Sequence, residues 1–308
     1  MRIGRQQLGL IIGAVCFVSC ATVLALVPSL KNYYGHRDGV TIREDLTYRA
    51  GSTHAKQQLD LYLPTHTREP FPLVVFVHGG IWKAQDRRLF QAATGLYGAV
   101  GLSLAHQGVG TAVVGYRQYP EVGFSEGIDD VATAVAFAQQ HAAEWGADPE
   151  ALFVAGHSSG GMLASLLALE PKYLRSAGAD PARIRGFVSI AGAYEPERLL
   201  PSLKADEAAI LTRCAGGKEG LPTFAPLRFA RADAPPMLLV SALRDAPFLV
   251  AQHRDMVKAM APAGDKITVV ELPGDDHMSM MLQLGTKHDT LSKPLLAFIN
   301  RVKQPSTP

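Results

Sequence analysis

Residues 151–167 read ALFVAGHSSGGMLASLL, and this stretch decides the fold that we expect for the chain. An apolar run typical of a short buried strand leads into a turn of serine and glycine, and an apolar stretch that fits a helix follows. The turn carries Ser158 between Gly156 and Gly160. A serine on a sharp strand-to-helix turn needs small flanking residues, because a β-carbon there would clash. The pattern predicts a strand, a strained turn that presents Ser158, and a helix.

A turn of this composition has a second interpretation, an anion cradle at the N-terminus of the helix. Neither a phosphate-loop lysine nor the glycine pattern of a dinucleotide site accompanies it. The sequence therefore favours a nucleophilic serine.

Strand and helix patterns alternate on both sides of this turn. Residues 58–64 alternate with period two and predict an early, half-exposed strand. Further strands are predicted at 72–77, 111–116, 186–191, 236–242 and 267–272, with helical patterns at 96–104, 128–138 and 291–302. Strands separated by helices predict an α/β fold, a mostly parallel central sheet flanked by helices on both faces, in one domain over 46–304. Residues 195–235, rich in Pro and Gly, predict a cap-like insertion over the site.

A serine hydroxyl needs a histidine base whose ring a carboxylate orients. His277 follows the last predicted strand through a short loop, where the base belongs if the chain order is serine, acid, histidine. His288 lies in a polar stretch typical of solvent exposure, and His253 precedes the expected position. We therefore expect His277 to be the base.

The acid is expected at Asp245, which follows a predicted strand and precedes His277. Asp275 and Asp276 are too close in sequence to that histidine to reach the far nitrogen of its ring, and we expect them to be exposed loop acids. Asp233 precedes its strand instead of following it. The expected catalytic residues are therefore Ser158, Asp245 and His277.

Residues 78–82 read HGGIW at the end of a predicted strand. Glycines let backbone amides approach a substrate closely, and such amides can stabilise the oxyanion of a tetrahedral intermediate. The expected oxyanion donors are Gly79 or Gly80 together with Ser159, the residue after the nucleophile. We expect His78 to brace this loop through a hydrogen bond to backbone.

Trp82 follows the oxyanion loop directly and has two possible roles. Its indole can bind substrate by walling the acyl side of the site beside Ser158, or it can seal the loop against the core. The residues leave both open.

The N-terminal residues 1–30 carry a charge-free run over 8–27 behind two arginines. A run of this length can span a bilayer as a helix, and the arginines place the catalytic domain outside the cytoplasm. We expect a signal-anchor that tethers the protein to the membrane. A cleaved signal and a lipoprotein modified at Cys20 remain open, and 31–45 is expected to be a tether.

Composition restricts the partners. The 308 residues include 30 basic and 28 acidic ones, for a formal net charge of +2, so no basic field argues for nucleic acid. No cluster of Cys or His has the spacing of zinc ligands. We therefore expect no metal and no cofactor, and a small-molecule ester as the substrate.

From residue 59 to the C-terminal helix the chain resembles the α/β-hydrolase superfamily, in the carboxylesterase branch shared by hormone-sensitive-lipase-like esterases, kynurenine formamidases and prenylcysteine methylesterases. The resemblance rests on LDLYLP (59–64), HGGxW (78–82), the serine turn, Asp245 and His277. It departs at Ile81, where the lipase-like loop has a third glycine, and at Ala242, where glycine is usual before the acid. The resemblance implies a serine hydrolase that cleaves carboxylic esters through an acyl-enzyme. Amide or formamide hydrolysis and an inactive binding module are the alternatives.

Overall fold

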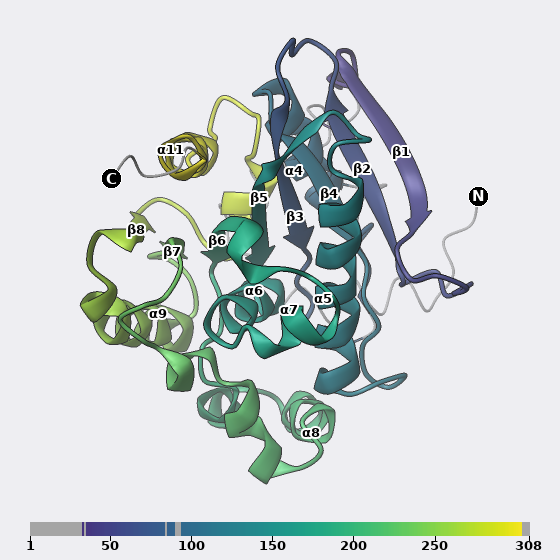
Figure 1. Cartoon of the computed structure of the whole chain (residues 1–308). Helices are drawn as coiled ribbons and strands as arrows, with labels where there is room; N and C mark the ends of the chain where they lie inside the picture. Colours follow the sequence, from purple (N-terminus) through teal and green to yellow (C-terminus); the bar gives the residue numbers. More distant parts are fainter. Residues whose placement is uncertain (1–32, 34, 84, 90–93, 304–308) are drawn as a thin grey trace, which may run out of the picture.

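The structure, a computed structural model, describes residues 33, 35–83, 85–89 and 94–303. Its strands are β1 (Val40–Thr47), β2 (Gln58–Pro64), β3 (Phe71–Val77), β4 (Gly110–Val114), β5 (Ala147–His157), β6 (Ile184–Ile190), β7 (Met237–Ala242) and β8 (Ile267–Leu272). They form one sheet of eight strands in the order β1-β2-β4-β3-β5-β6-β7-β8 (Figure 1). β2 runs antiparallel to both of its neighbours, and every other neighbouring pair is parallel. The expected mostly parallel sheet is confirmed.

Helices cover both faces of the sheet. The helices of the described residues are α4 (Leu96–His106), α5 (Phe124–His141), α6 (Ser159–Leu169), α7 (Lys172–Ser176), α8 (Ala205–Cys214), α9 (Pro247–Met260), α10 (Ser279–Leu282) and α11 (Ser292–Val302). Buried residues of α5, α6 and α9 belong to one hydrophobic cluster, and those of α4, α10 and α11 belong to the other. The two clusters are the two sides of a three-layered α/β fold.

The strand β3 shows how the sheet separates these clusters. Val75 and Val77 pack into the cluster with α5 and α6, whereas Val74 and Phe76 pack into the cluster with α4. Successive side chains of a strand point to opposite faces, so a strand buried on both faces is apolar throughout. This explains why 72–77 is a continuous apolar run.

The expected tether at 31–45 is wrong in its second half. β1 begins at Val40 and pairs with β2, so the fold starts before residue 46. Val40 and Ile42 pack partly against the cluster with α4, while the intervening and following polar residues face outward. A charged edge strand of this kind lacks the long apolar alternation that marks a strand in sequence.

β2 is also more buried than its alternation suggests. It lies between β1 and β4, and six of its seven residues are buried. Asp60 is 2% exposed, and its carboxylate accepts from Arg88 Nε at 2.7 Å. A buried acid with a charged partner produces the period-two pattern without an exposed face.

The segment 195–235, for which the sequence predicts a cap-like insertion, lies between β6 and β7. It contains α8 and three 3₁₀ helices, η3 (Pro196–Ser202), η4 (Lys218–Phe224) and η5 (Pro226–Phe229). In Figure 1, α8 lies below the sheet, on the side toward which the arrowhead of β3 points. The insertion is therefore on the side where the parallel strands end.

The expected signal-anchor at 1–30 lies outside the described residues. Among the helices that the structure does describe, none is long and apolar enough to cross a membrane.

His253 on α9 supplies a test of this core at acidic pH. It is 2% exposed, and neither ring nitrogen has a hydrogen-bond partner. Burial lowers the pKa of the ring, Arg254 lowers it further, and Glu271 opposes them. The folded protein therefore keeps this ring neutral at pH values where the unfolded chain protonates it.

We expect the free energy of unfolding to decrease as the pH falls below about 6.5, the unfolded histidine value, and to be unaffected by this group above it. The loss ends once the pH passes the lowered folded pKa. His253→Leu removes this proton linkage, so urea unfolding should show a smaller loss between about pH 7 and about pH 5 than in the wild type. Equal losses in the two proteins would contradict this expectation.

Candidate active site

Ser158 occupies the turn between β5 and α6 with φ 57° and ψ −121°. Residues other than glycine seldom adopt a backbone conformation with positive φ. Its amide donates to Ile190 O at 2.8 Å, which holds the turn against the end of β6. A Cβ on Gly156 would lie 2.2 Å from Gly160 O, and one on Gly160 would lie 2.1 Å from Val77 O. Both glycines are therefore required by close backbone approach, as the sequence predicts.

The structure brings Ser158, His277 and Asp245 together. His277 Nε2 lies 2.9 Å from Ser158 Oγ, and His277 Nδ1 lies 2.7 Å from Asp245 Oδ2. The serine hydroxyl can donate to Nε2 while Nδ1–H donates to the carboxylate. The side chain of Asp245 is 3% exposed and that of His277 is 19% exposed, so the carboxylate is dry and the imidazole reaches solvent.

The other histidines considered from the sequence lie elsewhere. His288 is exposed in the loop before α11, as expected. His253 is buried on α9, and neither of its ring nitrogens has a partner.

The expectation that Asp275 and Asp276 are exposed loop acids is wrong. They are 2% and 4% exposed. Asp275 accepts from Ser279 Oγ at 2.9 Å and Thr290 Oγ1 at 2.6 Å, whereas Asp276 accepts from the amide of Ser279 at 2.9 Å. Both carboxylates therefore stabilise the loop that carries His277 through hydrogen bonds. The partner of His277 Nδ1 is Asp245 and neither of these two acids. Asp233 is exposed and pairs with Arg231 at 2.9 Å.

Of the two glycines expected as alternative oxyanion donors in this loop, Gly79 already has a partner within the protein. Its amide donates to Tyr97 Oη at 3.0 Å, so this donor is already engaged. The amides of Gly80 and Ser159 make no hydrogen bond to any residue that the structure describes. Gly80 and Ser159 are therefore the two expected donors that remain open to an oxyanion.

His78 braces the loop, as expected. Its Nδ1–H donates to Gly79 O at 2.7 Å, and its ring stacks on Tyr116 with 4.6 Å between the ring centres. Tyr116 Oη in turn donates to His78 O at 3.2 Å. Complete burial lowers the pKa of His78 to about 4, so the ring is neutral near pH 7 and unsuited to act as a charged group.

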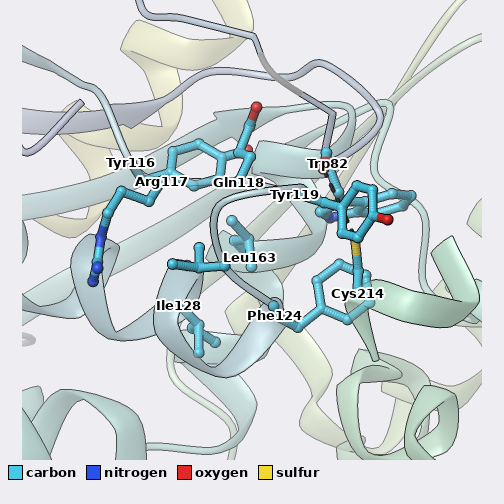
Figure 2. A pocket seen from close by; sticks show the side chains of 12 residues that line it. Trp82, Tyr116, Arg117, Gln118, Tyr119, Phe124, Ile128, Leu163 and Cys214 are labelled. Atoms are coloured by element: carbon cyan, nitrogen blue, oxygen red, sulfur yellow. Dashed lines mark hydrogen bonds between the residues drawn. The ribbon is translucent and has the colours of Figure 1, made fainter. Parts of the chain in front are cut away.

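Trp82 is placed for packing. Its side chain is 5% exposed and meets Phe124 edge to face, with 5.4 Å between ring centres. Figure 2 shows Trp82 and Cys214 beside each other at a hollow also lined by Tyr116 and Leu163. This hollow has a volume of about 10 Å³, room for one water molecule at most, and Ser158 does not line it. Of the two roles left open for Trp82, this placement favours sealing the loop against the core over contact with substrate.

Sequence reasoning missed Tyr97 and His157. Tyr97 Oη lies 3.3 Å from His157 Nδ1, and His157 Nε2 donates to His277 O at 2.9 Å. The signal for His157 was its place inside the serine turn. Nothing in the pattern of α4 distinguishes Tyr97 from its apolar neighbours. Among the described residues, no group of three or more His, Cys, Asp or Glu side chains is arranged to hold a metal ion.

The fold and this arrangement define an α/β-hydrolase, and solved structures agree. Esterase B from Lactobacillus Rhamnosis superposes with a TM-score of 0.73 at 20% identity, over 92% of this chain and 93% of that one. The profile of the BD-FAE family matches residues 59–260, so the chain belongs to that family. The resemblance to the α/β-hydrolase superfamily is confirmed.

Two curated relatives extend this comparison. A probable isoprenylcysteine alpha-carbonyl methylesterase of Oryza sativa subsp. japonica is 25% identical over 80% of this chain. The chain spans 61% of the length of that relative. A kynurenine formamidase of Salmo salar is 26% identical over 80% of this chain and 79% of its own length. Both names belong to the groups that the sequence resembles.

The serine turn can be tested through Gly160→Ala. The new Cβ would lie 2.1 Å from Val77 O and 2.7 Å from His78 O, and backbone atoms cannot move aside cheaply. We expect a loss of about 1–3 kcal/mol in the free energy of unfolding, measured by denaturant titration. Gly274→Ala is the control, because a Cβ there meets nothing within 4 Å and should cost less than about 0.5 kcal/mol. Equal stability of the two variants would show that the turn tolerates a side chain.

Proposed function

We propose that the protein is a serine hydrolase that cleaves carboxylic esters through an acyl-enzyme. The observation that carries this proposal is the series Asp245–His277–Ser158, joined at 2.7 Å and 2.9 Å. Ser158 is partly exposed at the start of α6, so a substrate can reach its hydroxyl.

In the acylation step, Ser158 Oγ attacks the acyl carbon while His277 Nε2 takes its proton. Asp245 stabilises the imidazolium that forms, and the amides of Gly80 and Ser159 stabilise the oxyanion. The C–O bond to the alcohol then breaks, and His277 returns the proton to the leaving oxygen. Water repeats the cycle on the acyl-enzyme and releases the acid.

Hydrolysis of an amide or formamide is the second candidate, because the same three residues serve both reactions. The Salmo salar relative, which is named a kynurenine formamidase, favours it. The Oryza sativa relative, which is named a methylesterase, favours esters. A panel of p-nitrophenyl esters of graded chain length beside N-formyl substrates, compared by kcat/KM, decides between them. Dominant turnover of the N-formyl substrates would overturn the ester assignment.

An inactive binding module is the remaining alternative. A fluorophosphonate reacts with an activated serine and not with an ordinary hydroxyl. Labelling of the wild type and not of Ser158→Ala would support the enzyme, and absence of labelling in both would support the module.

Substitution of the three residues tests their roles. We expect Ser158→Ala to abolish turnover in a folded protein, because the nucleophile is lost. Asp245→Asn should lower kcat by up to about 10⁴, because an amide cannot stabilise the imidazolium. Asp275→Asn is the matched control, since that carboxylate bonds Ser279 and Thr290 and not His277. A larger loss of kcat in folded Asp275→Asn than in Asp245→Asn would reassign the acid.

We further propose that the insertion 195–235 forms a cap beside the site. Two contacts support it: Cys214 Sγ lies 3.8 Å from Trp82 O, and the rings of Phe224 and Phe124 are 4.9 Å apart. The insertion thus packs against the residue that ends the oxyanion loop.

The N-terminal segment supports a membrane-tethered protein with its catalytic domain outside the cytoplasm, since 8–27 is uncharged behind two arginines. We expect a protein lacking 1–30 to leave the membrane fraction and to keep its activity. A truncated protein that still sediments with membranes would show that another surface binds them. If the protein expressed from the full-length sequence is found shortened at its N-terminus, the segment is a cleaved signal. Palmitate labelling that Cys20→Ala abolishes indicates a lipoprotein.

A further inference from the structure

Two buried side chains that the proposed reaction does not use lie between the oxyanion loop and His277. Tyr97 is the second residue of α4 and is 2% exposed. His157 precedes Ser158 and is 1% exposed. The ring centres of His157 and His277 are 4.7 Å apart, so this second histidine lies directly beside the proposed base.

Three hydrogen bonds connect these groups in one chain. Gly79 N lies 3.0 Å from Tyr97 Oη, Tyr97 Oη lies 3.3 Å from His157 Nδ1, and His157 Nε2 lies 2.9 Å from His277 O. One end of the chain is therefore the backbone of the oxyanion loop, and the other end is the backbone of the histidine loop.

The direction of every bond follows from its ends. The Gly79 amide can only donate, so Tyr97 Oη accepts from it. The carbonyl of His277 can only accept, so the ring of His157 carries a hydrogen on Nε2. A neutral ring then leaves Nδ1 as an acceptor for the Tyr97 hydroxyl. Burial and the neighbouring His277 lower the pKa of His157 well below its ordinary value, which keeps the ring in this neutral form.

We propose that Tyr97 and His157 are positioning residues that hold the oxyanion loop and the base loop in register on either side of Ser158. The hydrogen bond from the Gly79 amide to Tyr97 holds the backbone just before the expected donor Gly80. The hydrogen bond from His157 to the His277 carbonyl holds the backbone from which the imidazole extends. Neither residue touches substrate. The inference rests on the proposed hydrolase function, and it assigns to this site an internal brace that spans two loops.

The chain offers matched variants for a test. Tyr97→Phe removes only the hydroxyl, and His157→Leu removes both ring nitrogens. His157→Gln keeps an amide N–H that can reach the His277 carbonyl. Two controls remove similar buried groups elsewhere. Tyr48→Phe deletes a hydroxyl that donates to Gly115 O at 2.9 Å, and His253→Leu deletes a buried ring that has no partner.

The measurement is kcat and KM on p-nitrophenyl acetate, with kcat divided by the fraction of serine that a fluorophosphonate labels at completion. This division removes any effect of unfolded protein. We expect Tyr97→Phe and His157→Leu to lower kcat by about tenfold or more and to change KM by less than about twofold. The reason is that displacement of the oxyanion loop or of the His277 imidazole weakens contacts made in the transition state. His157→Gln should recover most of the loss, and both controls should stay within about twofold of the wild type.

The double variant Tyr97→Phe/His157→Leu supplies a second readout. If the two residues act through one series of hydrogen bonds, kcat of the double variant should be little lower than that of the worse single variant. Independent effects on kcat would multiply. Multiplying losses, or an unchanged kcat in both single variants of an active wild type, would overturn the positioning role alone. If His157→Leu does not fold, Tyr97→Phe and His157→Gln decide. A wild type that neither hydrolyses nor labels at Ser158 would overturn the proposed function and this inference with it.

Discussion

The rest of the site depends on the backbone of Ser158, which turns from β5 into α6 at φ 57° against the end of β3. This turn exists because Gly160 passes close to Val77 O, at a spacing that leaves no room for a Cβ. The same approach places the oxyanion loop beside the serine, since a Cβ on Gly79 would lie 2.9 Å from Ser158 Cβ. Two close approaches, of Gly160 to Val77 and of Gly79 to Ser158, thus set both the nucleophile and the loop that faces it.

The three proposed catalytic residues could be selected from sequence because each follows one of the parallel strands of the sheet. The loops after parallel strands open at one edge, so Ser158 after β5, Asp245 after β7 and His277 after β8 can meet there. Strand position and chain order are therefore sufficient to predict that these three side chains meet. The apolar runs that mark such strands arise from burial on both faces.

The features that sequence reasoning missed depend on partners that periodicity does not specify. The charged outward residues of β1 favour a tether, and only its pairing with β2 makes it a strand. Loop acids are commonly exposed, which is why the sequence predicts an exposed Asp275. The residue is buried instead, and Thr290, fifteen residues further on, donates a hydrogen bond to its carboxylate. The sequence leaves Gly79 and Gly80 as alternative donors, and the hydrogen bond from the Gly79 amide to Tyr97 on α4 favours Gly80. In each case a tertiary contact decides what the local pattern does not specify.

The two buried neighbours of His277, Asp245 and His157, differ in charge. The carboxylate of Asp245 lies in the dry interior, where its attraction for a positive imidazole is stronger than in water, whereas the ring itself remains partly exposed. The ring of His157, 4.7 Å away, would oppose that positive charge if it were itself protonated. Its buried position lowers its pKa and keeps it neutral, so it contributes a donor to the His277 carbonyl without adding a charge. A positive charge that develops on His277 therefore has an anionic partner on one side and a neutral ring on the other.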